Sequence, residues 1–264
     1  MDERLVVMTE QGMGDTIHFC RFAPILAELG FDVTILTDPP LARLLSTLRG
    51  VRIATSTAEL DQESRPMRWV PLMSVPGILG IKPTAIPAKV PYLSAEPDRV
   101  ASWADRLGAD GFKIGICWKS GNPRDRITRH RDIPFETYAP LAEIPGVRLI
   151  GLQLGPGVRQ IGQVSFHHRI EDMSQSLRDW ADTAALMMNL DVVVTCDTSV
   201  PHLAGALARS TFVALPSIAC WRWQLDRDDS PWYPTMRLFR QTTNGDWSDV
   251  FARIAVAVAG MSKR

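Results

Sequence analysis

Short apolar runs alternate with amphipathic stretches along most of this chain, and this alternation limits the folds open to it. Residues 5–8, 33–36 and 51–54 are apolar runs, while residues 15–29 and 41–48 carry apolar side chains at helical spacing. A glycine follows each predicted helix, where glycine commonly ends helices. The pattern predicts strand–helix–strand–helix–strand, which folds as a parallel sheet with crossover helices.

A second alternating series follows a proline-rich stretch. Seven prolines from Pro66 to Pro97 predict loop-rich structure over residues 67–93, leading to a helix over 97–107. Beyond it the predicted strands are 114–118, 147–152, 192–196 and 211–215, and the predicted helices are 135–143, 177–189, 201–208 and 247–258. We therefore predict an α/β fold with two Rossmann-like halves, 1–95 and 96–264, facing a cleft. Whether the last helix packs back on the first half stays open.

Composition excludes several classes of protein. The chain has 29 basic and 29 acidic residues, which disfavours strong non-specific binding to nucleic acid. No apolar run is as long as a transmembrane helix, and the first residues lack the pattern of a signal peptide. The four cysteines are widely spaced without a CxxC, which favours buried thiols in a reducing cytoplasm over disulfides or zinc. We expect a cytoplasmic protein; peripheral association with an inner membrane stays open.

Ligands bind doubly wound sheets beyond the carboxyl ends of the strands, so the residues there are candidates. After the first strand, Gly12 and Gly14 allow a tight turn into the helix. Ile17 stands where the dinucleotide-binding fingerprint has its third glycine, which disfavours a nicotinamide oxidoreductase. Asp15 is either a helix cap or a general base facing the cleft. His18 is an acceptor-side candidate or a structural histidine.

The strand 192–196 is nearly all apolar, as expected at the centre of a parallel sheet, and runs into a helix start. The free N–H groups of that helix, with the hydroxyls of Thr198 and Ser199, predict an anion site suited to phosphate. His202 can donate to a phosphate oxygen. Asp197 would repel phosphate, so we expect it to cap the helix or to bind sugar hydroxyls. Capping with a buried histidine is the alternative interpretation.

The strand 114–118 runs into a polar segment that includes Lys119 and Asn122. Four arginines lie within the next positions: Arg124, Arg126, Arg129 and Arg131. Arginine binds phosphate in a forked geometry, and positive charge stabilises a phosphate group that gains charge in a reaction. We expect Lys119, Asn122, Arg129 and Arg131 to bind a phosphate-bearing ligand such as a nucleotide diphosphate; a solvated charged surface is the alternative.

The tryptophan-rich segment 220–233 contains Asp226-Arg227-Asp228, a DxD pattern that holds a divalent metal in some glycosyltransferases. Here the pattern lies in a long loop and not at the end of a predicted strand. We expect no metal site, and a loop whose arginine pairs with acidic residues.

Together these segments resemble glycosyltransferase family 9, the ADP-heptose lipopolysaccharide heptosyltransferases, and especially the domains found C-terminal to tetratricopeptide repeats in bacterial proteins. The resemblance covers almost the whole chain. It rests on the motif 12–15 with His18, on 118–122 with the arginines, on 182–185, on the tail 221–232 and above all on 197–202.

The resemblance implies a GT-B fold and an inverting, metal-independent transfer without a cofactor, from a nucleotide sugar to a glycan, lipid-linked or protein acceptor. Asp15 matches the general base, and Asp197 a carboxylate that contacts the donor. Thr198, Ser199 and His202 match the pyrophosphate-binding turn. Gln153 falls near the nucleoside. The alternatives are a non-catalytic sugar-nucleotide-binding or interaction module of the same fold, and a sugar-nucleotide epimerase or hydrolase.

Overall fold

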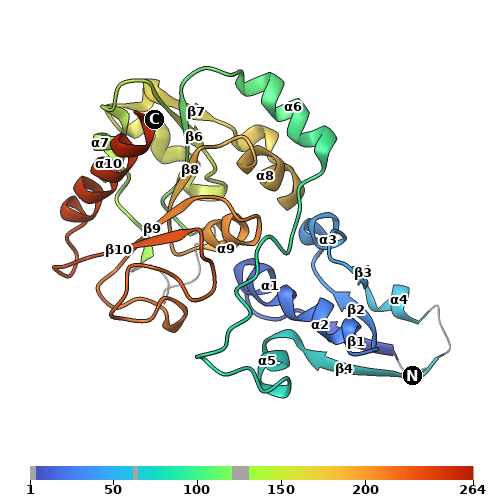
Figure 1. The fold of residues 1–264 in the computed structure, drawn as a ribbon. Coiled ribbons are helices and arrows are strands. Elements are labelled where there is room, and N and C mark those ends of the chain that lie inside the picture. The colour runs from blue at the N-terminus through green and yellow to red at the C-terminus, as the bar shows by residue number, and fades with distance from the viewer. Residues whose placement is uncertain (1–3, 62–64, 121–130, 264) are drawn as a thin grey trace.

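The chain folds into two β-sheets, each built from parallel strands, and the two sheets lie beside each other (Figure 1). The computed structural model describes residues 4–61, 65–120 and 131–263. The first sheet has four strands and the second has six. Each half is thus an α/β unit, and the chain has the two-sheet α/β architecture that its alternating pattern predicts.

The first sheet has the order β3-β2-β1-β4, with all neighbours parallel. Its strands are β1 (Arg4–Met8), β2 (Asp32–Leu36), β3 (Val51–Ala54) and β4 (Met67–Pro71). Its helices are α1 (Met13–Phe19), α2 (Ala23–Glu28), α3 (Pro39–Leu45), α4 (Thr57–Leu60) and α5 (Val75–Ile78).

Two features of the first half differ from the prediction. The single helix predicted over 15–29 is two helices, α1 and α2, joined by a 3-10 turn over Cys20–Phe22. Pro24 lies in the first turn of α2, where a helix tolerates a residue without an N–H group. Inside one continuous helix over 15–29 the same proline would remove a backbone hydrogen bond, so the helix divides there. The proline-rich stretch contains a strand, β4, which occupies the sheet edge and ends at Pro71. An edge strand tolerates proline because one side of its backbone makes no ladder hydrogen bonds.

The second sheet has the order β10-β9-β8-β5-β6-β7. Its strands are β5 (Phe112–Cys117), β6 (Val147–Gly151), β7 (Ile170–Asp172), β8 (Val192–Cys196), β9 (Thr211–Leu215) and β10 (Met236–Arg240). Its helices are α6 (Pro97–Leu107), α7 (Ala139–Ala142), α8 (Trp180–Met187), α9 (Ser199–Ala206) and α10 (Ser248–Ser262). Every residue of β8 and β9 is buried, as expected for inner strands. The edge strands β7 and β10 were not predicted.

The last helix packs within the second half. Four side chains of α10 are buried there: Val250, Phe251, Ile254 and Val258. The ring of Phe251 lies 4.4 Å from that of Tyr138, which belongs to the same apolar cluster. The apolar face of α10 is therefore covered by its own half.

The two halves share buried apolar surface. One cluster includes Phe19 and Phe22 from the first half together with Leu203 and Tyr233 from the second. Helix α1 packs against α9 and α3 against α8, which places the helix starts of both halves opposite each other (Figure 1). Among the described residues no helix is both long and apolar enough to cross a membrane.

Candidate functional site

A cleft of about 930 Å³ lies between the two halves, at the carboxyl ends of β1, β5, β6 and β8. Parallel strands bring their carboxyl ends to one edge, which is why residues far apart in the sequence meet here. Every predicted site residue that the structure describes lines the cleft, except His18: Gly12, Gly14, Asp15, Lys119, Arg131, Gln153, Asp197, Thr198, Ser199 and His202. The predicted Asn122 and Arg129 lie outside the described residues.

The turn into α1 is made differently from the prediction. Gln11 takes the left-handed conformation with φ of 64°, whereas Gly12 is extended with φ of −93°. Gly14 has a different role, because a β-carbon there would lie 3.2 Å from the Ser199 Cα and 3.3 Å from the His202 Cδ2. Because glycine has no β-carbon, Gly14 lets the start of α1 approach the start of α9.

Asp15 both caps its helix and lines the cleft, whereas its role as a general base stays a prediction. Its Oδ2 accepts a hydrogen bond from the Gly12 N–H at 3.0 Å, which satisfies a donor at the helix start. Its Oδ1 forms an ion pair with Arg222, and about a quarter of the Asp15 side chain is exposed, at 25%. A fixed, partly accessible carboxylate is thus presented to the cleft.

The start of α9 offers fewer backbone donors than the sequence predicted. The Thr198 hydroxyl accepts from the Val200 N–H at 3.3 Å, and Pro201 has no N–H to donate. Thr198 is therefore the cap, which corrects the expectation that Asp197 caps this helix. An anion here would depend more on the hydroxyls of Thr198 and Ser199 and on nearby cations.

Asp197 is nearly fully buried beneath the cleft, with 3% of its side chain exposed. Burial raises the pKa of its carboxyl group, and the charge of Arg131 opposes that rise. An Arg131 Nη1 lies 3.4 Å from both the carboxylate and the backbone carbonyl of Asp197. Arg131 thus brings positive charge to the start of α9, and its binding of a donor stays a prediction.

The loop after β5 is fixed by Gln153. Its Oε1 accepts from the N–H groups of Trp118 at 3.2 Å and Lys119 at 3.0 Å, and its Nε2 donates to the carbonyls of Lys119 and Leu154 at 3.1 and 2.8 Å. These bonds occupy both ends of the amide. Gln153 therefore supports the loop that presents Lys119, whose Nζ lies 3.4 Å from Asp132.

His18 is fully buried and does not line the cleft. Its Nδ1 lies 2.7 Å from the Tyr233 hydroxyl, and the Nδ1 of His202 lies 3.1 Å from the same oxygen. The Tyr233 hydroxyl can donate its single proton to only one of the two imidazoles. At least one histidine therefore carries a proton on Nδ1 and donates it to the Tyr233 oxygen. Burial lowers the pKa of both histidines well below the usual value, with Arg21 and Arg222 adding to the effect. The alternative interpretation, a structural histidine, fits His18 better than an acceptor-side role.

The tryptophan-rich segment 220–233 returns to the first half, which sequence reasoning missed. Arg222 pairs with Asp15, the Tyr233 hydroxyl binds His18, and the Trp232 carbonyl accepts from Arg21 at 2.9 Å. These contacts join residues more than 200 positions apart, and no local spacing signals them. We call residues 220–233 the clasp.

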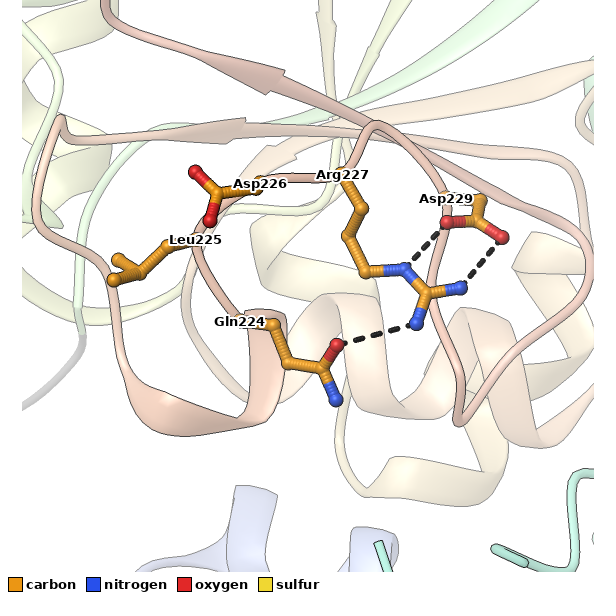
Figure 2. A pocket seen from close by; sticks show the side chains of 5 residues that line it. All are labelled: Gln224, Leu225, Asp226, Arg227 and Asp229. Atoms are coloured by element: carbon orange, nitrogen blue, oxygen red, sulfur yellow. Dashed lines mark hydrogen bonds and ion pairs between the residues drawn. The ribbon is translucent and has the colours of Figure 1, made fainter. Parts of the chain in front are cut away.

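Within the clasp, the DxD pattern forms an arginine-paired loop, as predicted. Arg227 binds both oxygens of Asp229 at 2.5 and 2.7 Å and donates to Gln224 at 3.2 Å (Figure 2). Asp226 belongs to the same shallow surface pocket, which is separate from the cleft. Across residues 4–61, 65–120 and 131–263, no group of three His, Cys, Asp or Glu side chains is placed to hold a metal ion.

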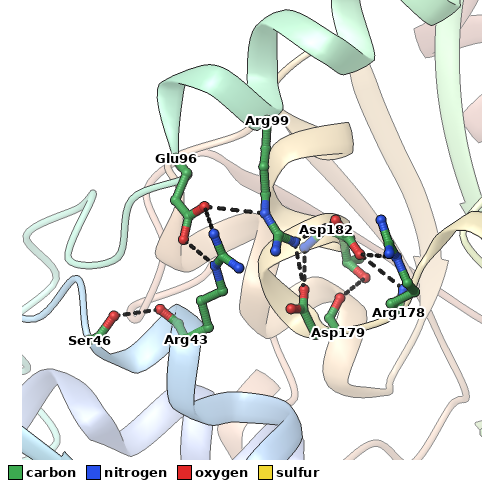
Figure 3. A network of polar contacts seen from close by, with 8 residues as sticks. Arg43, Ser46, Glu96, Arg99, Arg178, Asp179 and Asp182 are labelled. Carbon is green, nitrogen blue, oxygen red and sulfur yellow. Dashed lines mark hydrogen bonds and ion pairs between the residues drawn. The ribbon is translucent and has the colours of Figure 1, made fainter.

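The motif at 182–185 belongs to a polar network that links the halves (Figure 3). The Asp179 side chain caps α8 by accepting from the Asp182 N–H at 2.7 Å. Arg99 of α6 binds both Asp179 and Asp182 and also contacts Glu96, which in turn binds Arg43 of α3. The motif therefore has an architectural part at this junction, although Thr183 also reaches the cleft wall.

Comparison with known proteins identifies the fold. No protein-family model matches the chain. The structure is similar to ADP-heptose lipopolysaccharide heptosyltransferase II of E. coli, with a TM-score of 0.70, 13% identity and 98% of each chain covered. It is also similar to a glycosyl transferase family 9 protein from Veillonella parvula DSM 2008, with a TM-score of 0.71 and 12% identity over 98% of this chain and 97% of that one.

A third solved structure, the E. coli heptosyltransferase WaaC with ADP, matches with a TM-score of 0.55 and 12% identity over 98% of this chain and 99% of that one. The chain therefore has the two-domain GT-B fold of family 9 heptosyltransferases, as the resemblance implied. Among curated proteins, the chain is 28% identical over 279 residues to protein FlbA of Caulobacter vibrioides, covering 97% of this chain. It spans 46% of the length of that relative.

Proposed function

We propose that this protein is an inverting, metal-independent glycosyltransferase that moves a sugar from a nucleotide diphosphate to an acceptor hydroxyl. The observation that carries the proposal is the meeting of Asp15 and the start of α9 across one cleft, with Lys119 and Arg131 in its wall. A carboxylate and an anion-binding surface are the two groups that a single displacement at an anomeric carbon needs.

In this proposal Asp15 is the general base. Its carboxylate accepts the proton of the acceptor hydroxyl while that oxygen bonds to the anomeric carbon. The bond from the anomeric carbon to the diphosphate oxygen breaks in the same step, so the nucleotide diphosphate leaves and the sugar stays bonded to the acceptor oxygen with inverted anomeric configuration. The exposed fraction of Asp15, 25%, provides an accessible carboxylate for this proton transfer.

The leaving nucleotide diphosphate gains negative charge as the bond breaks. The hydroxyls of Thr198 and Ser199 and the cations Lys119 and Arg131 line the wall where this charge would develop. Preorganised donors and cations in a cleft stabilise such charge more than water does. The similar E. coli heptosyltransferase was solved with ADP, which supports a nucleotide diphosphate as the ligand class.

A second candidate is a non-catalytic sugar-nucleotide-binding module of the same fold. The observation that favours it is the ion pair between Asp15 and Arg222, because it commits one oxygen of that carboxylate to a contact within the protein. Product analysis separates the two candidates.

We also propose that the protein acts in the cytoplasm, since Cys20, Cys117, Cys196 and Cys220 are all free thiols.

The test is calorimetric titration of the protein with ADP-, GDP-, UDP- and CMP-linked sugars in metal-free buffer, followed by product analysis with the donor that binds. We expect micromolar binding of one donor class and release of the nucleotide diphosphate with an inverted sugar linkage. Binding without turnover, with glycan, lipid-linked and protein acceptors supplied, would support the non-catalytic module. No binding of any donor would overturn both candidates.

Activity is expected to survive a chelator, because Arg227 binds Asp229 beside the DxD pattern and the cations of the cleft wall would carry the leaving-group charge. Turnover should be the same with and without EDTA. A loss of activity that manganese restores would contradict metal independence and would direct attention to Asp226 and Asp228.

A further inference from the structure

Arg222 lines the cleft but has no role in the proposed transfer step. It belongs to the clasp of the second half, yet its guanidinium pairs with Asp15 at the start of α1 in the first half. Its residue exposure is 9%, so the pair is shielded far more than a surface ion pair. We propose that Arg222 is the positioning residue for Asp15: it fixes the orientation of the carboxylate that removes the acceptor proton. This inference rests on the proposed function.

The guanidinium is itself held firmly. Its central carbon lies 4.8 Å from the ring centroid of Trp221 and 5.4 Å from that of Phe19, within the range of cation–π attraction. An Nη1 donates to the Cys220 Sγ at 3.1 Å. Aromatic contacts from both halves thus restrict the arginine, and its position does not depend on the ion pair alone.

The other end of the clasp, at Trp232 and Tyr233, is anchored to the first half as well. Arg21, which is buried, donates to the Trp232 carbonyl at 2.9 Å and to the Tyr92 hydroxyl at 3.0 Å. Tyr233 binds His18 of α1 at 2.7 Å. The C-terminal end of the clasp is therefore held against the first half, near the helix that carries Asp15.

Two contacts then fix the orientation of the Asp15 carboxylate. Its Oδ2 is held by the Gly12 N–H at 3.0 Å and its Oδ1 by Arg222. Each carboxylate oxygen accepts more than one hydrogen bond, so the acceptor hydroxyl can still bind. The charge of Arg222 also acts on Asp197, where it opposes the effect of burial and the repulsion from Asp15. Without Arg222, two carboxylates would face one cleft with less positive charge between the halves.

The experiment compares Arg222→Gln, Arg222→Lys, Asp15→Asn and the double variant Asp15→Asn/Arg222→Gln. The matched control is Arg227→Gln, which removes an arginine from the same clasp outside the cleft. Donor affinity is measured by calorimetry with whichever of the ADP-, GDP-, UDP- or CMP-linked sugars the wild type binds. Turnover is measured as release of the corresponding nucleotide diphosphate.

We expect Arg222→Gln to lower kcat by about 100-fold, since misplacing a catalytic group by about 1 Å has effects of this size. The donor Kd should change less than twofold, Arg222→Lys should recover part of the turnover, and Arg227→Gln should match the wild type. On the Asp15→Asn background, Arg222→Gln should cause no further loss. A rise in donor Kd equal to the fall in kcat would assign Arg222 to phosphate binding instead. An equal loss on both backgrounds would show that it acts independently of Asp15.

Urea unfolding of the wild type, Arg222→Gln, Asp15→Asn and the double variant separates this inference from the proposed function. If Arg222 holds Asp15, the two substitutions should be non-additive, with a coupling of about tenfold in the unfolding equilibrium constant. Additive effects would overturn the inference whether or not the protein turns over a donor. Coupling without donor binding or turnover would overturn the proposed function and limit Arg222 to fixing the carboxylate.

Discussion

Two helix starts meet in the cleft, one from each half, and they differ in chemistry. Helix α1 begins beside Gly12 and carries the Asp15 carboxylate, which binds the Gly12 N–H and Arg222. Helix α9 begins after Thr198 and presents hydroxyl groups, with Arg131 close by. A helix start attracts anions because of its free N–H groups and its dipole. At α1 the protein supplies that anion itself, whereas at α9 we propose that the hydroxyls of Thr198 and Ser199, with Arg131, bind a ligand phosphate.

The side chains around each helix start thus suit the same local element to two different proposed roles. Both helices contribute a histidine to one tyrosine hydroxyl, so the two starts are also fixed relative to each other. Gly14 permits their close approach. The division of roles can be tested at each helix start, at the contact between them, and at the shared histidine pair.

The largest expected effect separates the roles by substitution at each helix start. Asp15→Asn should lower turnover by about 10³-fold, within the range of general base catalysis, and leave donor affinity within about twofold. Ser199→Ala should instead weaken donor binding by about tenfold, because it removes a hydrogen bond to a charged group. Calorimetry and product release measure both quantities. If each variant lost affinity and turnover equally, the division between α1 and α9 would be wrong.

A smaller effect is expected when the two starts are forced apart. Gly14→Val should reduce stability by about 1–3 kcal/mol and weaken donor binding, because its side chain would overlap Ser199 and His202. Gly77→Ala is the matched control, since a β-carbon there meets no atom within 4 Å. Urea unfolding and calorimetry check the prediction. Unchanged donor affinity in Gly14→Val would show that the approach of α1 to α9 does not shape the site.

The smallest effect concerns pH and the histidine pair. Burial lowers the pKa of His18 and His202 below the unfolded value of 6.5, so the folded state binds fewer protons than the unfolded state. Their stabilising contribution is therefore complete above about pH 6.5 and falls as the pH drops below it, by about 1–3 kcal/mol per pH unit for two such groups. Urea unfolding from about pH 7 to about pH 5.5 measures the slope.

His202→Gln is the informative variant for that slope. It should remove about half of the pH dependence while keeping a side chain able to bind the Tyr233 hydroxyl. The raised pKa of Asp197 acts with the opposite sign, because protonation of a buried carboxyl favours the folded state, but it acts in the acid range of a carboxyl group. An unchanged slope in His202→Gln would show that His202 is not held uncharged in the folded protein.

Part of this molecule follows directly from local sequence patterns. The alternation of apolar runs and helical periods fixes two parallel α/β halves, because each pattern has only one way to bury its apolar side chains. Once the strands are placed, the topology of parallel sheets puts Asp15, Lys119 and residues 197–199 at one edge. The places of these residues can be predicted without knowing any tertiary contact. The edge strand β4 was missed because it lies among prolines and ends at Pro71, and β7 because it has only three residues. The strand β10 was missed because its buried residues do not alternate strictly with exposed ones.

The tertiary structure decided what each of those residues contacts. Arg222 reaches Asp15 across 207 positions, and Tyr233 reaches His18 across 215, because the clasp folds back on α1. The side chain of Gln153 supports the loop after β5, and Thr198 rather than Asp197 caps α9. The sequence by itself determined which segments form the sheets and where the cleft lies, since backbone periodicity is local. Side-chain partners within the cleft depend on how distant loops pack, which only the folded chain determines.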